Sequence, residues 1–217
     1  MTWDLFADEP GVQADEAALT PGAVLLRGWA RTQGAELLEA VSEVIRQSPL
    51  RFMSTPGGYR MSVAMTNCGA AGWITDRSGY RYGALDPLSG RSWPAMPPLF
   101  STLAAAAAAR AGFDSFVPDA CLINQYEPGS RMSLHQDKDE RDYAAPIVSV
   151  SLGLRATFLF GGERRSDRAA RVALVHGDVV VWGGPARLRY HGVAPLKEGE
   201  HPLLGRRRIN LTFRRAL

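Results

Sequence analysis

The sequence predicts a mainly β fold with flanking helices (α+β), in which a β-rich core occupies the second half of the chain. From residue 119 onward, short segments rich in β-branched and aromatic residues are separated by Gly or Pro, which is typical of a sandwich or barrel. The first half carries two helical patterns instead. The chain of 217 residues suits one domain, and no internal repeat or linker divides it. We therefore expect residues 1–217 to form one domain whose helices support a single β core.

The first expected elements are a short strand and a helix. Residues 1–20 are acidic and expected to be irregular, and residues 23–27 read as a strand. The helix that follows would have Thr32 as its N-cap and end before Pro49. Its core-facing apolar stripe consists of Leu37, Leu38, Val41, Val44 and Ile45.

Residues 50–95 are expected to form a lid over a binding site. They begin with the turn cluster Thr55-Pro56-Gly57-Gly58-Tyr59 and continue with a strand-like alternation at residues 60–65. Between residues 69 and 92 the chain becomes loop-like and rich in Gly, and four aromatic residues lie in or beside this stretch: Trp73, Tyr80, Tyr82 and Trp93. Such a segment can serve as a binding lid. Aromatic side chains packed beneath a long loop are an equally good interpretation.

A second helix and the core strands follow. Pro97 and Pro98 open a helix that runs through an alanine-rich stretch to Arg110 and ends near Gly112. Its small side chains would allow close packing on a sheet. The expected core strands lie near residues 121–126, 147–160, 171–175, 179–182, 187–193 and 207–215.

Composition narrows the class of protein. The net charge of +3 and the pI near 9.1 are compatible with a polyanionic partner but do not require one. No apolar run approaches the roughly 18 residues of a membrane span, and no signal peptide is indicated, so we expect a cytoplasmic protein without a membrane partner. Cys68 and Cys121 do not form a disulfide framework, and we expect both to be reduced.

The segment from Ser133 to Glu140 has the pattern of a metal site. His135 and Asp137 are two residues apart in a segment that begins as a strand, so their side chains point the same way. A second His-x-Asp occurs at His176, but there a Gly follows the His and a strand follows the Asp, which indicates a tight turn. With His191 as a third ligand, the set becomes the two-His, one-carboxylate triad of non-haem Fe(II) oxygenases.

A polar ladder near the C-terminus suggests an anion pocket. Period-two alternation puts the apolar residues of 208–214 on one face and Arg208, Asn210, Thr212 and Arg214 on the other. A solvated polar face is an equally good interpretation of the strand alone. Beside a metal site, however, two inward arginines could bracket a small dicarboxylate such as 2-oxoglutarate. Asn124 and Tyr126, alternating on an earlier strand, could donate hydrogen bonds to the same ligand.

These motifs resemble the AlkB family of Fe(II)- and 2-oxoglutarate-dependent dioxygenases that repair alkylated nucleic-acid bases, and within it the bacterial branch. The resemblance covers most of the chain beyond the first helix and keeps the order of the motifs. It rests on Thr55–Tyr59, Met61–Gly69, Asn124-x-Tyr126, Leu134–Glu140, His176–Gly184, Tyr190-His191-Gly192 and Arg208–Arg214.

The resemblance implies a fold and a set of site residues. The fold would be a double-stranded β-helix, or jelly-roll, core at residues 119–217 with an N-terminal helical and lid segment. Fe(II) would be held by His135, Asp137 and His191. The residues assigned to 2-oxoglutarate are Asn124, Tyr126, Arg208, Asn210 and Arg214. Around the damaged base would lie Trp73, which stacks on it, with Tyr80, Met61 and Asp139. The nucleic-acid backbone would lie near Thr55, Tyr59, Arg131 and Arg165.

The resemblance also implies the chemistry. With O2 as a further cosubstrate, 2-oxoglutarate is decarboxylated to succinate and CO2 while the N-alkyl group is hydroxylated, and a methyl adduct leaves as formaldehyde. The partner would be alkylated single- or double-stranded DNA, with RNA left open, and we expect a monomer. Two alternatives remain: a 2-oxoglutarate oxygenase of a protein, lipid or small molecule, and a jelly-roll that binds metal or nucleic acid without turnover.

Overall fold

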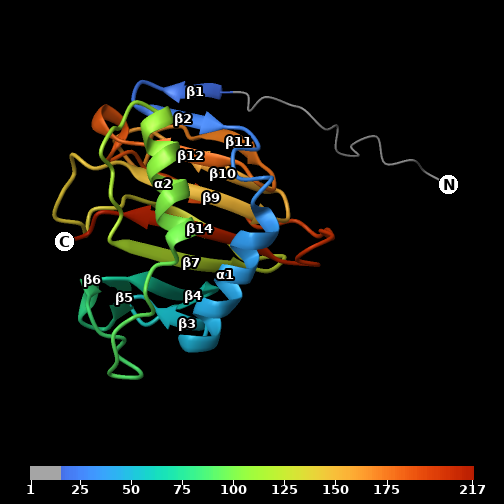
Figure 1. The fold of residues 1–217 in the computed structure, drawn as a ribbon. Helices are drawn as coiled ribbons and strands as arrows, with labels where there is room; N and C mark the ends of the chain where they lie inside the picture. Colours follow the sequence, from blue (N-terminus) through green and yellow to red (C-terminus); the bar gives the residue numbers. More distant parts are fainter. Residues whose placement is uncertain (1–15) are drawn as a thin grey trace.

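The computed structural model describes residues 16–217 and consists of two antiparallel sheets with two helices on one side (Figure 1). The large sheet has the strand order β1 (Glu16–Thr20), β2 (Ala23–Leu26), β12 (Val179–Trp182), β9 (Ile147–Gly153), β14 (Arg208–Arg214), β7 (Ala120–Tyr126), β4 (Arg60–Gly69) and β3 (Arg51–Ser54). The small sheet has the order β11 (Ala170–Leu174), β10 (Ala156–Phe160), β13 (His191–Val193) and β8 (Met132–His135). A separate hairpin pairs β5 (Gly72–Asp76) with β6 (Gly79–Gly83).

The two sheets pack face to face, as a jelly-roll requires. Phe158 and Phe160 of the small sheet share one hydrophobic cluster with Ile147 and Trp182 of the large sheet. The expected mainly β class with a jelly-roll core and flanking helices is therefore confirmed. Four strands from the first half of the chain, β1 to β4, also belong to the large sheet, so the β core extends beyond residues 119–217.

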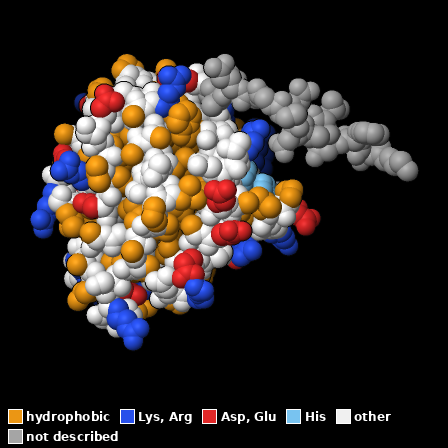
Figure 2. Space-filling view, in the orientation of Figure 1, with side chains coloured by type: hydrophobic (Ala, Val, Ile, Leu, Met, Phe, Trp, Pro, Cys, Tyr) orange, Lys and Arg blue, Asp and Glu red, His pale blue; other side chains and the backbone are white. Residues whose placement is uncertain are grey.

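Both helices, α1 (Gly34–Gln47) and α2 (Pro98–Arg110), cover the outer face of the large sheet (Figure 1). The buried residues Leu37, Val41 and Val44 of α1 follow the expected helical spacing. In α2 the buried face includes Ala104, Ala107 and Ala108, whose small side chains let the helix approach the sheet closely. In Figure 2 hydrophobic side chains gather over the position of α2, with Lys and Arg around the edge of this face.

Two expectations for the N-terminal elements were wrong. Residues 16–20 are not irregular but form β1, paired with β2; residues 1–15 of that expectation lie outside the described residues. The first helix is not capped by Thr32, because its N-cap is Gln33, which makes no side-chain capping hydrogen bond. The first residue of the helix packs against a distant segment: a Cβ on Gly34 would lie 2.3 Å from Nε2 of His176, so a larger residue there would require the imidazole to move.

Residues 69–92 are more regular than their sequence indicates. The β5–β6 hairpin lies inside the expected loop, closed by a turn in which the Asp76 carboxylate accepts a hydrogen bond from the Ser78 N–H and pairs with Arg81. Its register pairs Trp73 with Tyr82 and Thr75 with Tyr80, so these four side chains share one face.

The strand expected at residues 187–193 is shorter than its pattern suggests. A 3-10 turn, η1 (Gly184–Ala186), precedes it, and the chain becomes extended only at His191. Backbone hydrogen bonds of the turn, from the Arg187 N–H to the Gly184 carbonyl and from the Arg189 N–H to the Ala186 carbonyl, replace strand pairing here. Arg187 donates from Nε to the Ala145 carbonyl, and Arg189 donates from Nε to the Gly161 carbonyl. Within residues 16–217, neither helix is long and apolar enough to cross a membrane.

Candidate metal centre and cosubstrate pocket

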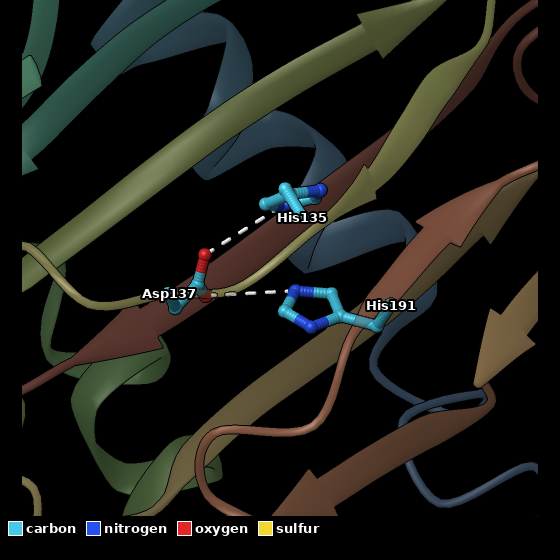
Figure 3. Close-up of side chains that lie close together, drawn as sticks. All are labelled: His135, Asp137 and His191. Carbon is cyan, nitrogen blue, oxygen red and sulfur yellow. Dashed lines mark ion pairs between the residues drawn. The ribbon is translucent and has the colours of Figure 1, made fainter. Parts of the chain in front are cut away.

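The small sheet brings two histidines and an aspartate together. His135 ends β8, His191 begins β13, and the two are directly paired in the strand register. Asp137 lies two residues beyond β8, with Oδ1 3.6 Å from Nε2 of His135 and Oδ2 3.8 Å from Nε2 of His191 (Figure 3). Ligand atoms that are each about 2.1 Å from one ion lie roughly 3–4 Å apart. Within residues 16–217 these three side chains form the one cluster of at least three metal-ligating groups.

Backbone carbonyls orient both imidazoles. Nδ1 of His135 lies 2.9 Å from the Ser133 carbonyl oxygen, and Nδ1 of His191 lies 3.0 Å from that of Arg189. A carbonyl can only accept, so each Nδ1 carries the hydrogen and each Nε2 keeps its lone pair for a metal. The second His-x-Asp has a different role, as expected. Oδ2 of Asp178 accepts a hydrogen bond from the Val175 N–H of its own turn, and Gly177 has a φ of +87°.

Two of the three candidate ligands, Asp137 and His191, have shifted pKa values that favour metal binding. Burial, reinforced by the neighbouring His135, lowers the pKa of His191 to about 4. Burial raises the pKa of Asp137, but the charge of Arg214 and the two imidazoles outweigh it, so the net pKa is well below the usual range. At neutral pH a metal would therefore meet a neutral His191 imidazole and an ionised carboxylate.

Arg214 holds the Asp137 carboxylate in place. Its Nε and Nη2 donate to Oδ2 of Asp137 at 2.9 and 2.7 Å, and both side chains are only 8% exposed. The sequence patterns did not assign a role to three further members of this group: the buried Glu140 and Arg187 and the partly buried Tyr82. Glu140 lies three residues after Asp137 and forms ion pairs with Arg187 at 3.0 Å and with Arg214 at 3.3 Å.

A cavity between the two sheets extends from His135 and His191 to the other end of the arginine ladder. As expected, β14 turns its apolar residues toward the helices, and its polar residues line this cavity. The cavity walls also include residues that the sequence did not assign to the site, namely Leu122, Met132, Ser149, Phe158, Trp182 and Val193. No local signal distinguishes these residues from ordinary core positions.

The cavity fits a small carboxylate. Arg208 is buried and forms no ion pair within the described part of the chain, and its Nη1 lacks a hydrogen-bond partner. Oδ1 of Asn124 and Nε1 of Trp182 are likewise buried without partners. Leaving such groups unpaired is costly, so their convergence on one cavity indicates a ligand that pairs with them. Tyr126 lies against Arg208, whose guanidinium carbon is 4.9 Å from the ring centre.

Comparison with known proteins gives the family. The family model of the 2OG-Fe(II) oxygenase superfamily matches residues 22–214. The alpha-ketoglutarate-dependent dioxygenase AlkB of Salmonella typhimurium is 59% identical over 98% of this chain and 97% of its own length. The protein of that name from Escherichia coli is 57% identical over the same shares. The chain belongs to the AlkB family of 2OG-Fe(II) oxygenases. The solved structure of OsALKBH1 matches with a TM-score of 0.79 and 29% identity, covering 93% of this chain and 100% of that one.

In this AlkB-family chain the β5–β6 hairpin, which lies within the expected lid, brings several of the expected base-binding residues together. Trp73 and Tyr80 stack with ring centres 5.6 Å apart and an interplanar angle of 17°. Nε1 of Trp73 donates to Oδ2 of Asp139 at 2.8 Å. Met61 and Trp73 pack against a hydrophobic cluster that also contains Tyr126, a residue of the cavity wall.

The four residues expected near a nucleic-acid backbone lie apart from the cavity. Oγ1 of Thr55 accepts a hydrogen bond from the Tyr59 N–H, and the Tyr59 side chain is 79% exposed. Arg131 and Arg165 are also exposed, Arg131 beside the lid and Arg165 in the turn between β10 and β11. Their assignment to the backbone of a bound strand stays a prediction.

Proposed function

We propose that the protein is an Fe(II)- and 2-oxoglutarate-dependent dioxygenase that oxidatively dealkylates N-alkylated bases in DNA, with RNA as a further candidate substrate. One observation carries the proposal: the His135, Asp137 and His191 cluster opens into a cavity whose buried polar atoms lack partners. A metal ion would bind to the three ligands, and an anionic cosubstrate would bind both to the open coordination positions of the ion and to the unpartnered polar atoms of the cavity. The AlkB-family membership supports the nucleic-acid substrate.

Each group of residues has a part in this chemistry. His135, Asp137 and His191 would hold Fe(II) on one face. Arg208 would pair with one carboxylate of 2-oxoglutarate, with hydrogen bonds from Tyr126 and Asn124 beside it; Asn210 and Arg214 complete the proposed cosubstrate set. When bound, Fe(II) and 2-oxoglutarate use O2 to hydroxylate the N-alkyl group, with succinate and CO2 as products, and a methyl adduct is then lost as formaldehyde.

The lid would hold the damaged base. A base buried in a duplex must leave the stack before its alkyl group can reach the metal, and damaged pairs cost less to open. The flat faces of Trp73 and Tyr80 offer stacking surfaces, and the Asp139 carboxylate can accept a hydrogen bond from a base edge. The exposed arginines Arg131 and Arg165 would contact the phosphates.

The test is a repair assay. The protein is incubated with N-methylated oligonucleotides, Fe(II), ascorbate and 2-oxoglutarate, and formaldehyde, succinate and the restored base are measured. We expect all three products, and none with His135→Ala. Succinate release that responds to another substrate class, with no repair of any methylated oligonucleotide, would support an oxygenase of proteins, lipids or small molecules instead. The monomeric state and the cytoplasmic location stay predictions.

A further inference from the structure

The adjacent acidic residues Asp139 and Glu140 accept hydrogen bonds from one cross-strand pair of the β5–β6 hairpin, which we call the lid hairpin. Trp73 of β5 and Tyr82 of β6 are directly opposite each other in the hairpin register. Nε1 of Trp73 donates to Asp139 at 2.8 Å, and the Tyr82 hydroxyl donates to Oε1 of Glu140 at 2.7 Å. The two carboxylates thus bind the two strands of the lid at the same level. We refer to these four residues as the lid clamp.

Within the lid clamp, Glu140 is also connected to the candidate metal ligand Asp137, through two arginines. Glu140 is only 2% exposed, and its second oxygen pairs with Arg187. Arg187 in turn donates from Nη1 to the backbone carbonyl of Asp137 at 2.7 Å. Arg214 lies between the two carboxylates, bound to Oδ2 of Asp137 and 3.3 Å from Oε1 of Glu140. The side chain and the backbone of the metal-binding aspartate are therefore both connected to Glu140.

The ion pairs of Asp137 and Glu140 depend on one another because two negative charges balance two positive charges. The two carboxylates, Asp137 and Glu140, face the two guanidinium groups, Arg187 and Arg214, in a region that solvent barely reaches. Because a buried charge without its partner is costly, a change at Glu140 must be felt by both arginines and through them by Asp137. Among residues 16–217, the hydrogen bond from the Tyr82 hydroxyl links the lid hairpin to this group through Glu140.

We propose that Glu140 is a positioning residue that couples the lid hairpin to the metal-binding carboxylate, so that the seated lid and the productive orientation of Asp137 and Arg214 occur together. This inference rests on the proposed function and describes how that activity would be regulated. When the lid hairpin is closed over a bound base, the contacts through Glu140 favour the orientation of Asp137 that binds the metal. Oxidation would then be coupled to the presence of substrate.

Tyr82→Phe tests the connection from the lid side, because it removes one hydroxyl and keeps the ring. A two-stranded hairpin is marginally stable alone, so its amides report whether it is attached. In the protein without metal or cosubstrate, we expect amide hydrogen exchange at residues 72–83 to become roughly tenfold faster, the effect of losing a hydrogen bond to a charged group. In the repair assay, the yield of formaldehyde per succinate should fall.

Tyr143→Phe is the matched control. The Tyr143 hydroxyl donates to the Lys138 carbonyl at 2.7 Å on the same segment, and the substitution keeps the ring, which lies against Arg187. We expect exchange in the lid and the formaldehyde yield to match the wild type. Equal exchange in Tyr82→Phe and wild type, faster exchange in both variants, or faster exchange in Tyr82→Phe with an unchanged formaldehyde yield would each overturn the proposal. If the wild type repairs nothing, the proposed function fails, and the exchange data still decide whether the clamp holds the lid.

Glu140→Gln tests the connection from the metal side. It keeps the size of the side chain and leaves Arg187 and Arg214 short of one negative charge. Titration with Mn2+ alone should show roughly tenfold weaker binding, the loss typical of residues that support metal ligands. Glu198→Gln, which alters an exposed ion pair with Arg206, should bind Mn2+ as the wild type does. Equal affinity in a folded Glu140→Gln protein would overturn the connection to the metal centre.

Discussion

The guanidinium group of Arg214 donates two hydrogen bonds to one carboxylate oxygen of Asp137, although 77 residues separate them in the chain. Arg208, at the other end of β14, has no ion-pair partner in the described part of the chain. The two arginines of the ladder thus differ in role in this structure. Arg214 is bound to a candidate metal ligand, and Arg208 is available to an incoming anion.

Replacing Arg214 by Met should destabilise the fold. The change keeps much of the side-chain volume but leaves the Asp137 carboxylate buried without its partner, which costs about 3–5 kcal/mol. Urea unfolding of the metal-free protein measures this loss. Arg110→Met is the matched control, because the exposed ion pair of Arg110 with Glu16 should contribute less than about 1 kcal/mol. A loss for Arg214→Met as small as the control would contradict the assigned role.

Arg208→Lys should weaken cosubstrate binding more than it slows turnover. Lysine keeps the charge but loses the planar fork that matches a carboxylate. The loss of one charge-assisted hydrogen bond is about 1.5–3 kcal/mol, or roughly 10- to 150-fold in the KM for 2-oxoglutarate. Steady-state succinate assays measure it. The neighbouring Arg207 is exposed and binds the Leu204 carbonyl, so Arg207→Lys should leave this KM unchanged. Equal KM values for the two variants would refute the anion pocket at Arg208.

The two His-x-Asp sequences provide a test of the metal site. His191→Ala and His135→Ala should each reduce succinate formation and Mn2+ affinity by more than about 100-fold, because they remove ligands rather than supporting groups. A chelator should have the same effect on the wild type. His176→Ala is the control: the His176 side chain accepts a hydrogen bond from the Gly153 N–H, outside the metal cluster. Retained Mn2+ binding by folded His191→Ala would exclude the triad.

Local patterns in the sequence predicted which face each residue occupies. The alternation of residues 208–214 is decided by the geometry of a single strand, and the structure places its polar face on the cavity and its apolar face under the helices. The same holds for the spacing of His135 and Asp137 and for the helical stripe of α1. In each case the local spacing carries the information, even for Asp137, which lies two residues beyond the end of β8.

The partners of buried charges could not be predicted in this way. The lid clamp joins residues 73, 82, 139 and 140, and Arg187 reaches Glu140 from a turn that the sequence presents as strand. Such pairings depend on how distant segments pack, for which the sequence has no local period. The start of α1 is a similar case, because no capping side chain marks it and Gly34 packs there against His176 of a distant segment.

Asp139→Ala should change which methylated bases are repaired. The carboxylate holds Trp73 and can accept a hydrogen bond from a base edge, so its loss affects bases that offer a donor more than bases that do not. The change is measured as repair rates on oligonucleotides that are methylated at different ring positions. Each rate is divided by the rate at which the variant releases succinate without nucleic acid, which corrects for altered 2-oxoglutarate turnover. Asp142→Ala, on the same segment, should keep the wild-type order of preference. An unchanged order in Asp139→Ala would remove Asp139 from lesion recognition.

An ion pair joins Arg51 to Asp86, two residues of the segment 50–95 that is expected to form the lid. Nη2 of Arg51 lies 2.8 Å from Oδ1 of Asp86, and the Leu88 N–H donates to the same carboxylate. The Arg51 guanidinium also stacks over the Trp93 ring at 5.1 Å. Burial raises the pKa of Asp86, but the hydrogen bonds from Arg51 and Leu88 and the charge of Arg51 outweigh it and hold the pKa below its usual value.

This ion pair should make the stability of the protein depend on pH in the acid range. Because the pKa of Asp86 is lower in the folded than in the unfolded state, its contribution is complete above the unfolded pKa of about 3.9 and is lost as the pH falls through the folded value. Asp86→Asn should therefore be less stable at pH 6 and lose less on acidification, as urea unfolding between pH 6 and pH 3 measures. Asp142→Asn, from an exposed pair with Arg215, should follow the wild-type curve. Parallel curves for Asp86→Asn and wild type would show that the Arg51–Asp86 pair does not anchor the lid.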